Sequence, residues 1–225
     1  MQNQPSNSLR FVFLHGKGSS GKDTIAANLL EHTSNGVKIS TGDIVRDSKI
    51  PGHKYHDLLA PYTLSSDTAG KLVPDTVMVR VVQEEIEERV AQGTRFFVFT
   101  GFPRTEPQLT ATDTMLLSMQ ETYPNKADHI VLAVLDRHSR ERAERRAQLA
   151  EQQNQPVRSD DRFEVVERRL KVYAEYVLPM LKRLQDEGRL HIVRGNRDIP
   201  RVTEQTQGYL AQEQNIPFLP QRARR

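Results

Sequence analysis

A glycine-rich run near the N-terminus carries the clearest chemical signal in this sequence. Its glycines would let the backbone turn so that several N–H groups converge on one anion, and a helix starting directly after it would add the positive end of its dipole. Lys22 places a mobile positive charge at the end of the run. These features predict a cradle for phosphate oxygens, the alternative being a tight turn that binds nothing. The run comprises Gly16, Lys17, Gly18, Ser19, Ser20, Gly21, Lys22, Asp23 and Thr24.

Three further segments combine glycine with polar side chains beside apolar runs. Residues 40–46 and 101–108 each follow an apolar run, and residues 70–75 precede a long amphipathic stretch. Taken alone, residues 40–46 also fit a helix cap followed by an apolar helix face, and residues 101–108 fit a turn that enters a helix. The candidate binding residues in these segments are Thr41, Gly42, Asp43, Arg46, Lys71, Leu72, Val73, Gly101, Phe102, Arg104 and Gln108.

Basic side chains are unevenly distributed, although the formal net charge is only +3. They are concentrated between Arg137 and Lys171 and again at the C-terminal end of the chain. This distribution favours an anionic partner, either a nucleic acid or the triphosphate of a nucleotide. A solvated helix face with paired Glu and Arg is the alternative. The candidates for phosphate contacts are Arg145, Arg146, Arg158, Arg169 and Arg197.

Short apolar runs alternate with longer amphipathic stretches, a pattern typical of βα units and a mostly parallel sheet. Strands are predicted at 11–14, 37–40, 95–100, 130–135 and 190–193. Most are continuous apolar runs, as expected for strands covered by helices on both faces. Helices are predicted at about 22–33, 74–92, 106–120, 139–152, 161–187 and 199–212. Residues 47–70 and 152–159 do not fit the sheet and are predicted to form flaps over it.

Composition narrows the class of protein further. With 225 residues, of which 36% are hydrophobic, the chain is long enough to bury one core, and no apolar run reaches the 18 or so residues that a membrane span needs. The absence of cysteine excludes disulfides and thiolate zinc sites, so a metal would be held by oxygen ligands or phosphate. The polar N-terminal residues lack the apolar core of a secretory signal, which predicts a cytoplasmic protein. The sequence shows no spare apolar helix face that would require a partner, so we predict a monomer.

The motifs together resemble those of the adenylate kinase family. Residues 16–24 are similar to its GxPGxGKGT loop, 40–46 to STGDMLR, 70–75 to GxLVPD and 101–108 to GFPRTxxQ. Residues 158–173 are similar to its RxDDxxxxxxxRLxxY lid motif, and 195–197 to the loop over the ATP base. The resemblance implies an α/β fold of the P-loop NTPase type, with a parallel five-stranded sheet and helices on both faces. It also implies a single kinase domain over 1–225, with a nucleoside monophosphate (NMP) binding insert at about 40–73 and a short lid at about 147–160.

The same resemblance implies a nucleoside monophosphate kinase that moves a phosphoryl group from Mg-ATP to AMP. Residues 16–24 and Arg197 would bind ATP, and Arg145 or Arg146 would stack on its adenine. Asp43 would lie near Mg²⁺ through water, while the two carboxylates at 160 and 161 would orient the lid arginines. Lys22, Arg104, Arg158 and Arg169 would stabilise the transferred charge. The acceptor would contact Thr41, Gly42, Arg46, Lys71, Leu72, Val73, Gly101, Phe102, Arg104, Gln108, Arg158 and Arg169.

Base choice follows from two of these positions. Related UMP/CMP kinases usually carry Ala at the position of Thr41 and Asn at that of Gln108, so the resemblance favours adenine. The long insert, which contains His53, Lys54, Tyr55 and His56, leaves open another acceptor such as UMP, CMP or a deoxynucleotide. A nucleic acid is disfavoured as the partner, because aromatic residues are not interleaved with the basic run.

Two positions depart from the family pattern. Asp23 stands where the P-loop motif has its last glycine. Thr100 stands where the family usually has an aspartate, directly before GFPR, that helps to hold magnesium-bound water. Three consequences are open at this level: weaker metal binding, compensation by Asp23 or Asp43, or a protein that binds nucleotides with little turnover.

Overall fold

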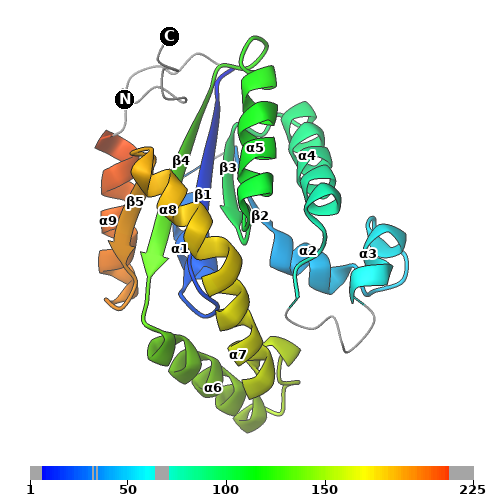
Figure 1. The fold of residues 1–225 in the computed structure, drawn as a ribbon, viewed down its shortest axis with the longest axis vertical. Coiled ribbons are helices and arrows are strands. Elements are labelled where there is room, and N and C mark those ends of the chain that lie inside the picture. The colour runs from blue at the N-terminus through cyan, green and yellow to red at the C-terminus, as the bar shows by residue number, and fades with distance from the viewer. Residues whose placement is uncertain (1–6, 32, 34, 64–70, 213–225) are drawn as a thin grey trace.

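The computed structural model describes residues 7–31, 33, 35–63 and 71–212. Its centre is a five-stranded parallel sheet in the order β2-β3-β1-β4-β5 (Figure 1). The predicted α/β fold with a parallel sheet is confirmed. The strands are β1 (Leu9–His15), β2 (Gly36–Ser40), β3 (Phe96–Thr100), β4 (Asn125–Ala133) and β5 (Leu190–Arg194).

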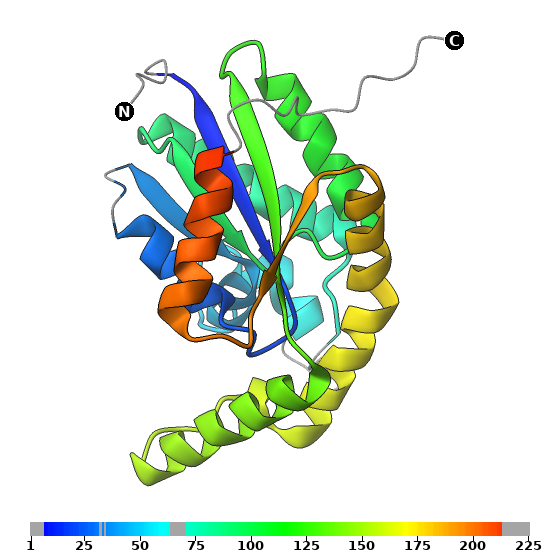
Figure 2. The ribbon, with the colours of Figure 1, turned by 90° about the vertical axis from the view of Figure 1, so that its left-hand side faces the viewer.

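Alternate residues of the central strands face two different hydrophobic layers. On one side, Phe11 and Phe13 of β1 pack with Phe97 and Phe99 of β3 beneath α4 (Asp75–Ala91) and α5 (Glu106–Met119). On the other side, Val12, Leu14 and their neighbours pack against α1 (Lys22–Leu30) and α9 (Ile199–Gln212). Both faces are therefore covered, which explains why the strands are continuous apolar runs (Figure 2).

The polar insert between β2 and α4 contains two short helices that the apolar pattern did not predict as separate elements. They are α2 (Thr41–Asp47) and α3 (His56–Thr63). Ser40 caps α2, because its hydroxyl accepts from the Asp43 N–H at 3.2 Å. Residues 64–70, which belong to the predicted insert, lie outside the described residues, as do the basic C-terminal residues 213–225.

The stretch predicted as one helix over 161–187 is not a continuous α-helix. A short 3-10 turn (Ser159–Asp161) leads into α7 (Phe163–Val172), a π-helical turn (Tyr173–Val177) follows, and α8 (Leu178–Asp186) completes it. Pro179 has no N–H to donate to the preceding turn, so the α-helical hydrogen-bond register is interrupted at the start of α8. With α6 (Asp136–Gln152), α7 projects away from the sheet (Figure 2). No helix in the described part of the chain is long and apolar enough to cross a membrane.

Two stacked histidines are buried where β1 and β4 meet. His15 Nε2 lies 3.0 Å from His129 Nδ1, and the His129 ring stacks on Phe13 with centroids 4.8 Å apart. Burial, with a smaller contribution from the charge of Lys22, lowers the pKa of His15 from 6.5 to about 3. Burial also lowers the pKa of His129, and the neighbouring His15 adds to the effect. Both rings are therefore neutral in the folded protein at neutral pH.

Acid should destabilise the fold through this pair. Between pH 6.5 and about 3 the unfolded chain binds a proton at His15 that the folded chain does not. The free energy of unfolding should therefore fall with decreasing pH, by about 1.4 kcal/mol per pH unit for each imidazole that stays neutral. Denaturant unfolding at several pH values measures this slope. A His129→Leu variant should have a shallower slope, and calorimetric proton uptake on unfolding of the unmodified chain provides a second readout. Equal slopes and no proton uptake would contradict the assignment.

Candidate active site

The glycine-rich run forms a loop between β1 and α1, at the carboxyl end of the sheet. Gly16 has φ +142°, and a Cβ there would lie 2.8 Å from Ser20 Oγ and 2.9 Å from the Leu132 carbonyl, so only glycine fits. Ser19 has φ +58°, an uncommon conformation for a residue with a side chain. The loop therefore has the close-approach geometry that the sequence predicts for a phosphate cradle.

Lys22 lies at the first position of α1 with its ammonium held by the loop itself. Its Nζ donates to the carbonyls of Gly16 (3.0 Å) and Lys17 (2.8 Å). Burial lowers the pKa of Lys22 to about 7, against the attraction of Asp23, and the positive charges of Arg169 and Arg104 add to the lowering. An anion bound in the loop would relieve this unfavourable burial of positive charge.

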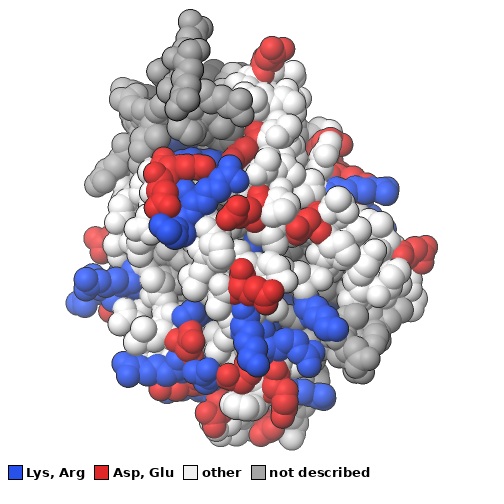
Figure 3. Space-filling model, viewed as in Figure 1, with Lys and Arg blue, Asp and Glu red and all other residues white. Residues whose placement is uncertain are grey.

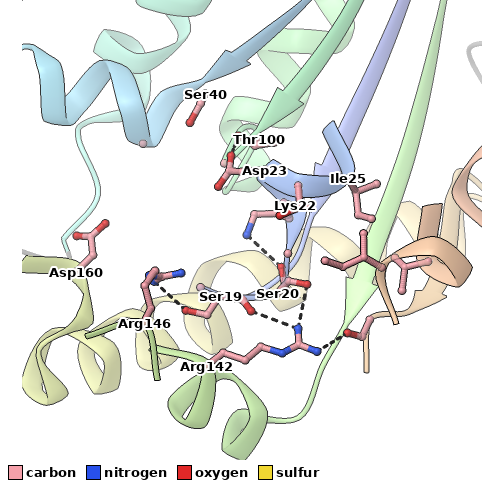
Figure 4. Close-up of a pocket in the computed structure, with 18 of the residues that line it drawn as sticks. Ser19, Ser20, Lys22, Asp23, Ile25, Ser40, Thr100, Arg142, Arg146 and Asp160 are labelled. Carbon is pink, nitrogen blue, oxygen red and sulfur yellow. Dashed lines mark hydrogen bonds between the residues drawn. The ribbon is translucent and has the colours of Figure 1, made fainter. Parts of the chain in front are cut away.

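A cleft of about 720 Å³ opens over the loop (Figure 4). Its lining brings together most of the predicted phosphate-binding side chains and is rich in positive charge. The basic residues are Lys22, Arg46, Arg104, Arg142, Arg146, Arg158, Arg169 and Arg197, against only Asp23, Asp160 and Asp198. Such an excess of positive charge in a concave site favours a polyanionic ligand.

A second cavity of about 120 Å³ adjoins the first. The predicted acceptor residues that line it are Thr41, Gly42, Arg46, Lys71, Leu72, Val73, Gly101, Arg104, Gln108 and Arg169. Arg46, Arg104 and Arg169 line both cavities, so they lie where ligands in the two would meet. Phe102 was also predicted to line this cavity. It is instead 1% exposed, because its apolar ring packs into the hydrophobic core under α4.

The turn after β3 is fixed by hydrogen bonds between the predicted acceptor residues. Arg104 Nε donates to the Gly101 carbonyl at 2.7 Å, and the Thr41 hydroxyl donates to the same carbonyl at 2.8 Å. The side-chain oxygen of Gln108 accepts from the Arg104 N–H at 2.8 Å, while its amide nitrogen donates to Asp75 at 2.8 Å. These contacts fix the Arg104 backbone through Gln108 and its guanidinium through the Gly101 carbonyl.

Two neighbouring carboxylates orient the arginines that enter the cleft from α2, α6 and α7. Asp160 accepts from Arg46 at 3.1 Å and pairs with Arg169 at 3.0 Å. Asp161 is buried and accepts from Arg146 Nε at 2.7 Å. Charge-assisted hydrogen bonds of this kind hold long side chains in one geometry. Arg158, which the sequence also predicts as an acceptor contact, lines the large cleft beside them and not the second cavity.

The structure separates the two arginines between which the sequence could not choose. Arg146 lines the cleft, whereas Arg145 lies in a different pocket, because adjacent residues of a helix point about 100° apart. Arg142, which the sequence analysis did not predict, lines the cleft together with Arg146. Its guanidinium donates to the Gly195 carbonyl at 2.9 Å and to the Ser20 carbonyl at 3.3 Å. The signal was present in the four-residue spacing of Arg142 and Arg146, which places both on one helix face.

Other basic residues of the same helices form ion pairs on the outer face. Figure 3 shows Lys and Arg lying beside Asp and Glu over α6 and α7. One such pair joins the two helices, with Arg140 Nη2 donating to Glu167 at 3.0 Å. Basic and acidic side chains thus alternate on this face. The arrangement is that of a solvated, ion-paired helix surface and not of a uniform nucleic-acid track.

The two departures from the family motif contact each other. The Thr100 hydroxyl, at the end of β3, donates to Asp23 Oδ1 at 2.9 Å. Asp43, the predicted metal-associated residue, does not line the cleft; it accepts from Lys38 at 3.2 Å and pairs with Arg46. In the described ranges, no group of three or more His, Cys, Asp or Glu side chains could by itself hold a metal ion.

Comparison with known proteins finds one family along most of the chain. The family model described as adenylate kinase matches residues 14–189. The adenylate kinase of Thermus thermophilus is 34% identical over 184 residues, which cover 82% of this chain and 87% of the relative. That of Nitrobacter winogradskyi is 30% identical over 203 residues, covering 87% and 89%. That of Thermosynechococcus vestitus is 33% identical over 211 residues, covering 92% and 100%.

Proposed function

Since the chain belongs to the adenylate kinase family and is therefore a nucleoside monophosphate kinase, we propose that it transfers the γ-phosphoryl group of ATP to AMP, giving two molecules of ADP. One observation carries the assignment of the sites. The large cleft over the glycine-rich loop and the small cavity beside it share Arg46, Arg104 and Arg169. Two nucleotides bound separately would thus have their phosphates among the same three guanidinium groups.

ATP occupies the large cleft in this proposal. The loop at 16–24 receives its phosphates on backbone N–H groups, with Lys22 against the terminal ones. The adenine end lies toward Arg142 and Arg197, which line the same cleft beside Gly195 at the end of β5. Arg146 and Arg158 lie between these two ends as further phosphate ligands.

AMP occupies the small cavity. Arg46 and Arg104 hold its phosphate, and Leu72 and Val73 pack against its base. Gln108 and Thr41 lie in the same lining and supply the polar groups that favour adenine. Gln108 is held between the Arg104 N–H and Asp75, so base recognition and phosphate binding are joined through one side chain.

The chemistry requires positioning and positive charge more than proton transfer. An oxygen of the acceptor phosphate, already ionised at neutral pH, attacks the γ-phosphorus in line, and the bond from that phosphorus to the β-phosphate oxygen breaks. Lys22, Arg104, Arg158 and Arg169 stabilise the negative charge on the phosphoryl oxygens as it moves. Mg²⁺ would be bound through the ATP phosphates and supply further positive charge there.

Two segments of the chain would move over the bound nucleotides. Residues 40–73 form the insert that binds the acceptor, and 147–160 the short lid that excludes water when it closes. We place the enzyme in the cytoplasm as a monomer. Asp160, which pairs with Arg46 of the insert and with Arg169, gives the lid a direct contact with the acceptor side.

The acceptor assignment predicts a clear order of substrates. With Mg-ATP held constant, ADP formation should be fastest with AMP, and kcat/KM for UMP, CMP and GMP should be lower by at least about 10-fold, because the other bases present a hydrogen-bonding edge that does not match Gln108 and Thr41 in the lining. A coupled ADP assay with each monophosphate, and with dAMP, measures this order. A higher kcat/KM with a pyrimidine monophosphate would overturn the adenine assignment and leave the kinase assignment intact.

A further inference from the structure

The carboxylate of Asp23 has an unusual location for a site that binds polyanions. It lies directly after Lys22, in the first turn of α1, and lines the cleft beside Thr24 and Gly101 (Figure 4). Its side chain is 62% exposed. An unneutralised carboxylate at this place would repel the phosphates of ATP. We therefore expect a cation to lie between the Asp23 carboxylate and the phosphates.

The contacts of Asp23 involve only one of its two carboxylate oxygens in the described part of the chain. Oδ1 accepts from the Thr100 hydroxyl at 2.9 Å and lies 3.7 Å from Lys38 Nζ. Within the described residues both polar contacts of this carboxylate involve Oδ1, which leaves Oδ2 for a ligand. Thr100 is 3% exposed and is fixed at the end of β3, so it holds the carboxylate from a rigid element.

The other carboxylates near the cleft are already engaged. Asp160 is bound by Arg46 and Arg169. Asp198 lies at the opposite end, near Arg197, and pairs with Arg201 at 3.5 Å. Asp43 is bound by Lys38 and Arg46 and lies outside the lining. Of the described cleft residues, Asp23 is therefore the carboxylate best placed beside the terminal phosphates.

This donor set fits Mg²⁺. The ion prefers oxygen ligands, keeps several waters, and is commonly bound through one or two carboxylates together with substrate phosphates. Asp23 supplies one carboxylate next to the phosphate loop, and the hydroxyl of Thr24 lies at the following position.

We propose that Asp23, positioned by Thr100, is the residue that holds the nucleotide-bound magnesium and its water, and that it replaces in this chain the aspartate expected at position 100. The inference rests on the proposed function. It follows from the contact between the two departures: the carboxylate lies at the start of α1, and the hydroxyl at the end of β3 hydrogen-bonds to it. Asp43, bound to two cations elsewhere, does not take this role.

The test is the dependence of ATP affinity on magnesium, measured as the ratio of dissociation constants in EDTA and in Mg²⁺ by displacement of a fluorescent ATP analogue. Asp23→Asn should lower this ratio by about 10-fold. Affinity for ATP in EDTA should stay equal or increase, because the repulsion is removed. Thr100→Val should lower the ratio by about 5-fold, since it removes only the hydrogen bond that positions the carboxylate.

The exchange variant gives the sharpest outcome. Asp23→Gly combined with Thr100→Asp should restore the ratio that Asp23→Gly alone loses, because the carboxylate returns to the neighbouring element. Asp198→Asn, a change in the same cleft, should leave the ratio unchanged. The proposal is overturned if Asp23→Asn weakens binding equally with and without Mg²⁺, or if Asp43→Asn and not Asp23→Asn lowers the ratio. Because the readout is binding, failure of the unmodified protein to phosphorylate AMP would instead count against the proposed function.

Discussion

Replacing Lys22 by alanine should lower kcat for ADP formation by a factor on the order of 10²–10³, with little change in the KM for AMP. The side chain contributes a positive charge at the phosphate loop, and that charge stabilises the transition state more than the ground state. Its ammonium is bound to carbonyls of the loop at 2.8 and 3.0 Å, so it is already placed beside the phosphate site.

The stability of the same variant separates this account from a structural role. Burial lowers the pKa of Lys22 to about 7, which means that the folded protein holds the ammonium at a cost. Lys22→Ala should therefore unfold at a temperature no lower than that of the unmodified chain. Steady-state kinetics and thermal unfolding measure the two effects, with Lys182→Ala, an exposed lysine paired to Asp186, as the matched control. Loss of activity that merely parallels loss of folded protein would contradict the role given to Lys22.

Arg104→Ala should have the second large effect, a loss on the order of 10³ in kcat/KM for the acceptor. Arg104 lines both cavities, and its Nε is fixed on the Gly101 carbonyl at 2.7 Å. Burial, with the nearby charge of Arg169, lowers the pKa of Arg104 to about 10, so the guanidinium remains charged at neutral pH. The variant loses both a ligand of the acceptor phosphate and a charge beside the transferred group.

Separate binding measurements should resolve these two contributions. ATP affinity should fall by less than about 10-fold, since several other basic groups remain in the large cleft. Arg104→Lys should recover little activity, because an ammonium cannot reproduce the two-pronged geometry of guanidinium. Arg145→Ala removes an arginine outside the cleft and should leave kcat/KM nearly unchanged. If Arg145→Ala and Arg104→Ala lose comparable activity, the position of Arg104 between the two cavities does not explain its effect on kcat/KM.

Those parts of the fold that depend on continuous local patterns could be predicted from sequence. The strand cores at 11–14, 37–40 and 190–193 lie inside β1, β2 and β5, because strands buried on both faces show as unbroken apolar runs. Helices such as α9 (Ile199–Gln212) were bounded correctly by their amphipathic pattern. The break of 161–187 into α7, a π-helical turn and α8 could not be found in this way, since the apolar period continues through it.

Side-chain placement in the site could be predicted only where a motif fixes it. The motif residues that the sequence grouped as acceptor contacts largely line one cavity, and Phe102 departs because a phenylalanine after a buried strand finds a better environment in the core. Arg142 was missed because five arginines between 137 and 146 offer several helix registers. The hydrogen bond from Thr100 to Asp23 joins residues 77 positions apart, so spacing alone could not reveal it.

We expect this chain to transfer the terminal phosphoryl group of ATP to AMP between two cavities that share Arg46, Arg104 and Arg169. The most direct measurement incubates the unmodified protein and Mg²⁺ with ATP labelled at the γ-phosphate and unlabelled AMP, and follows the label. The account predicts label in the β-phosphate of ADP formed from AMP, and none above background when AMP is omitted. Label released as inorganic phosphate at the same rate with and without AMP would contradict it.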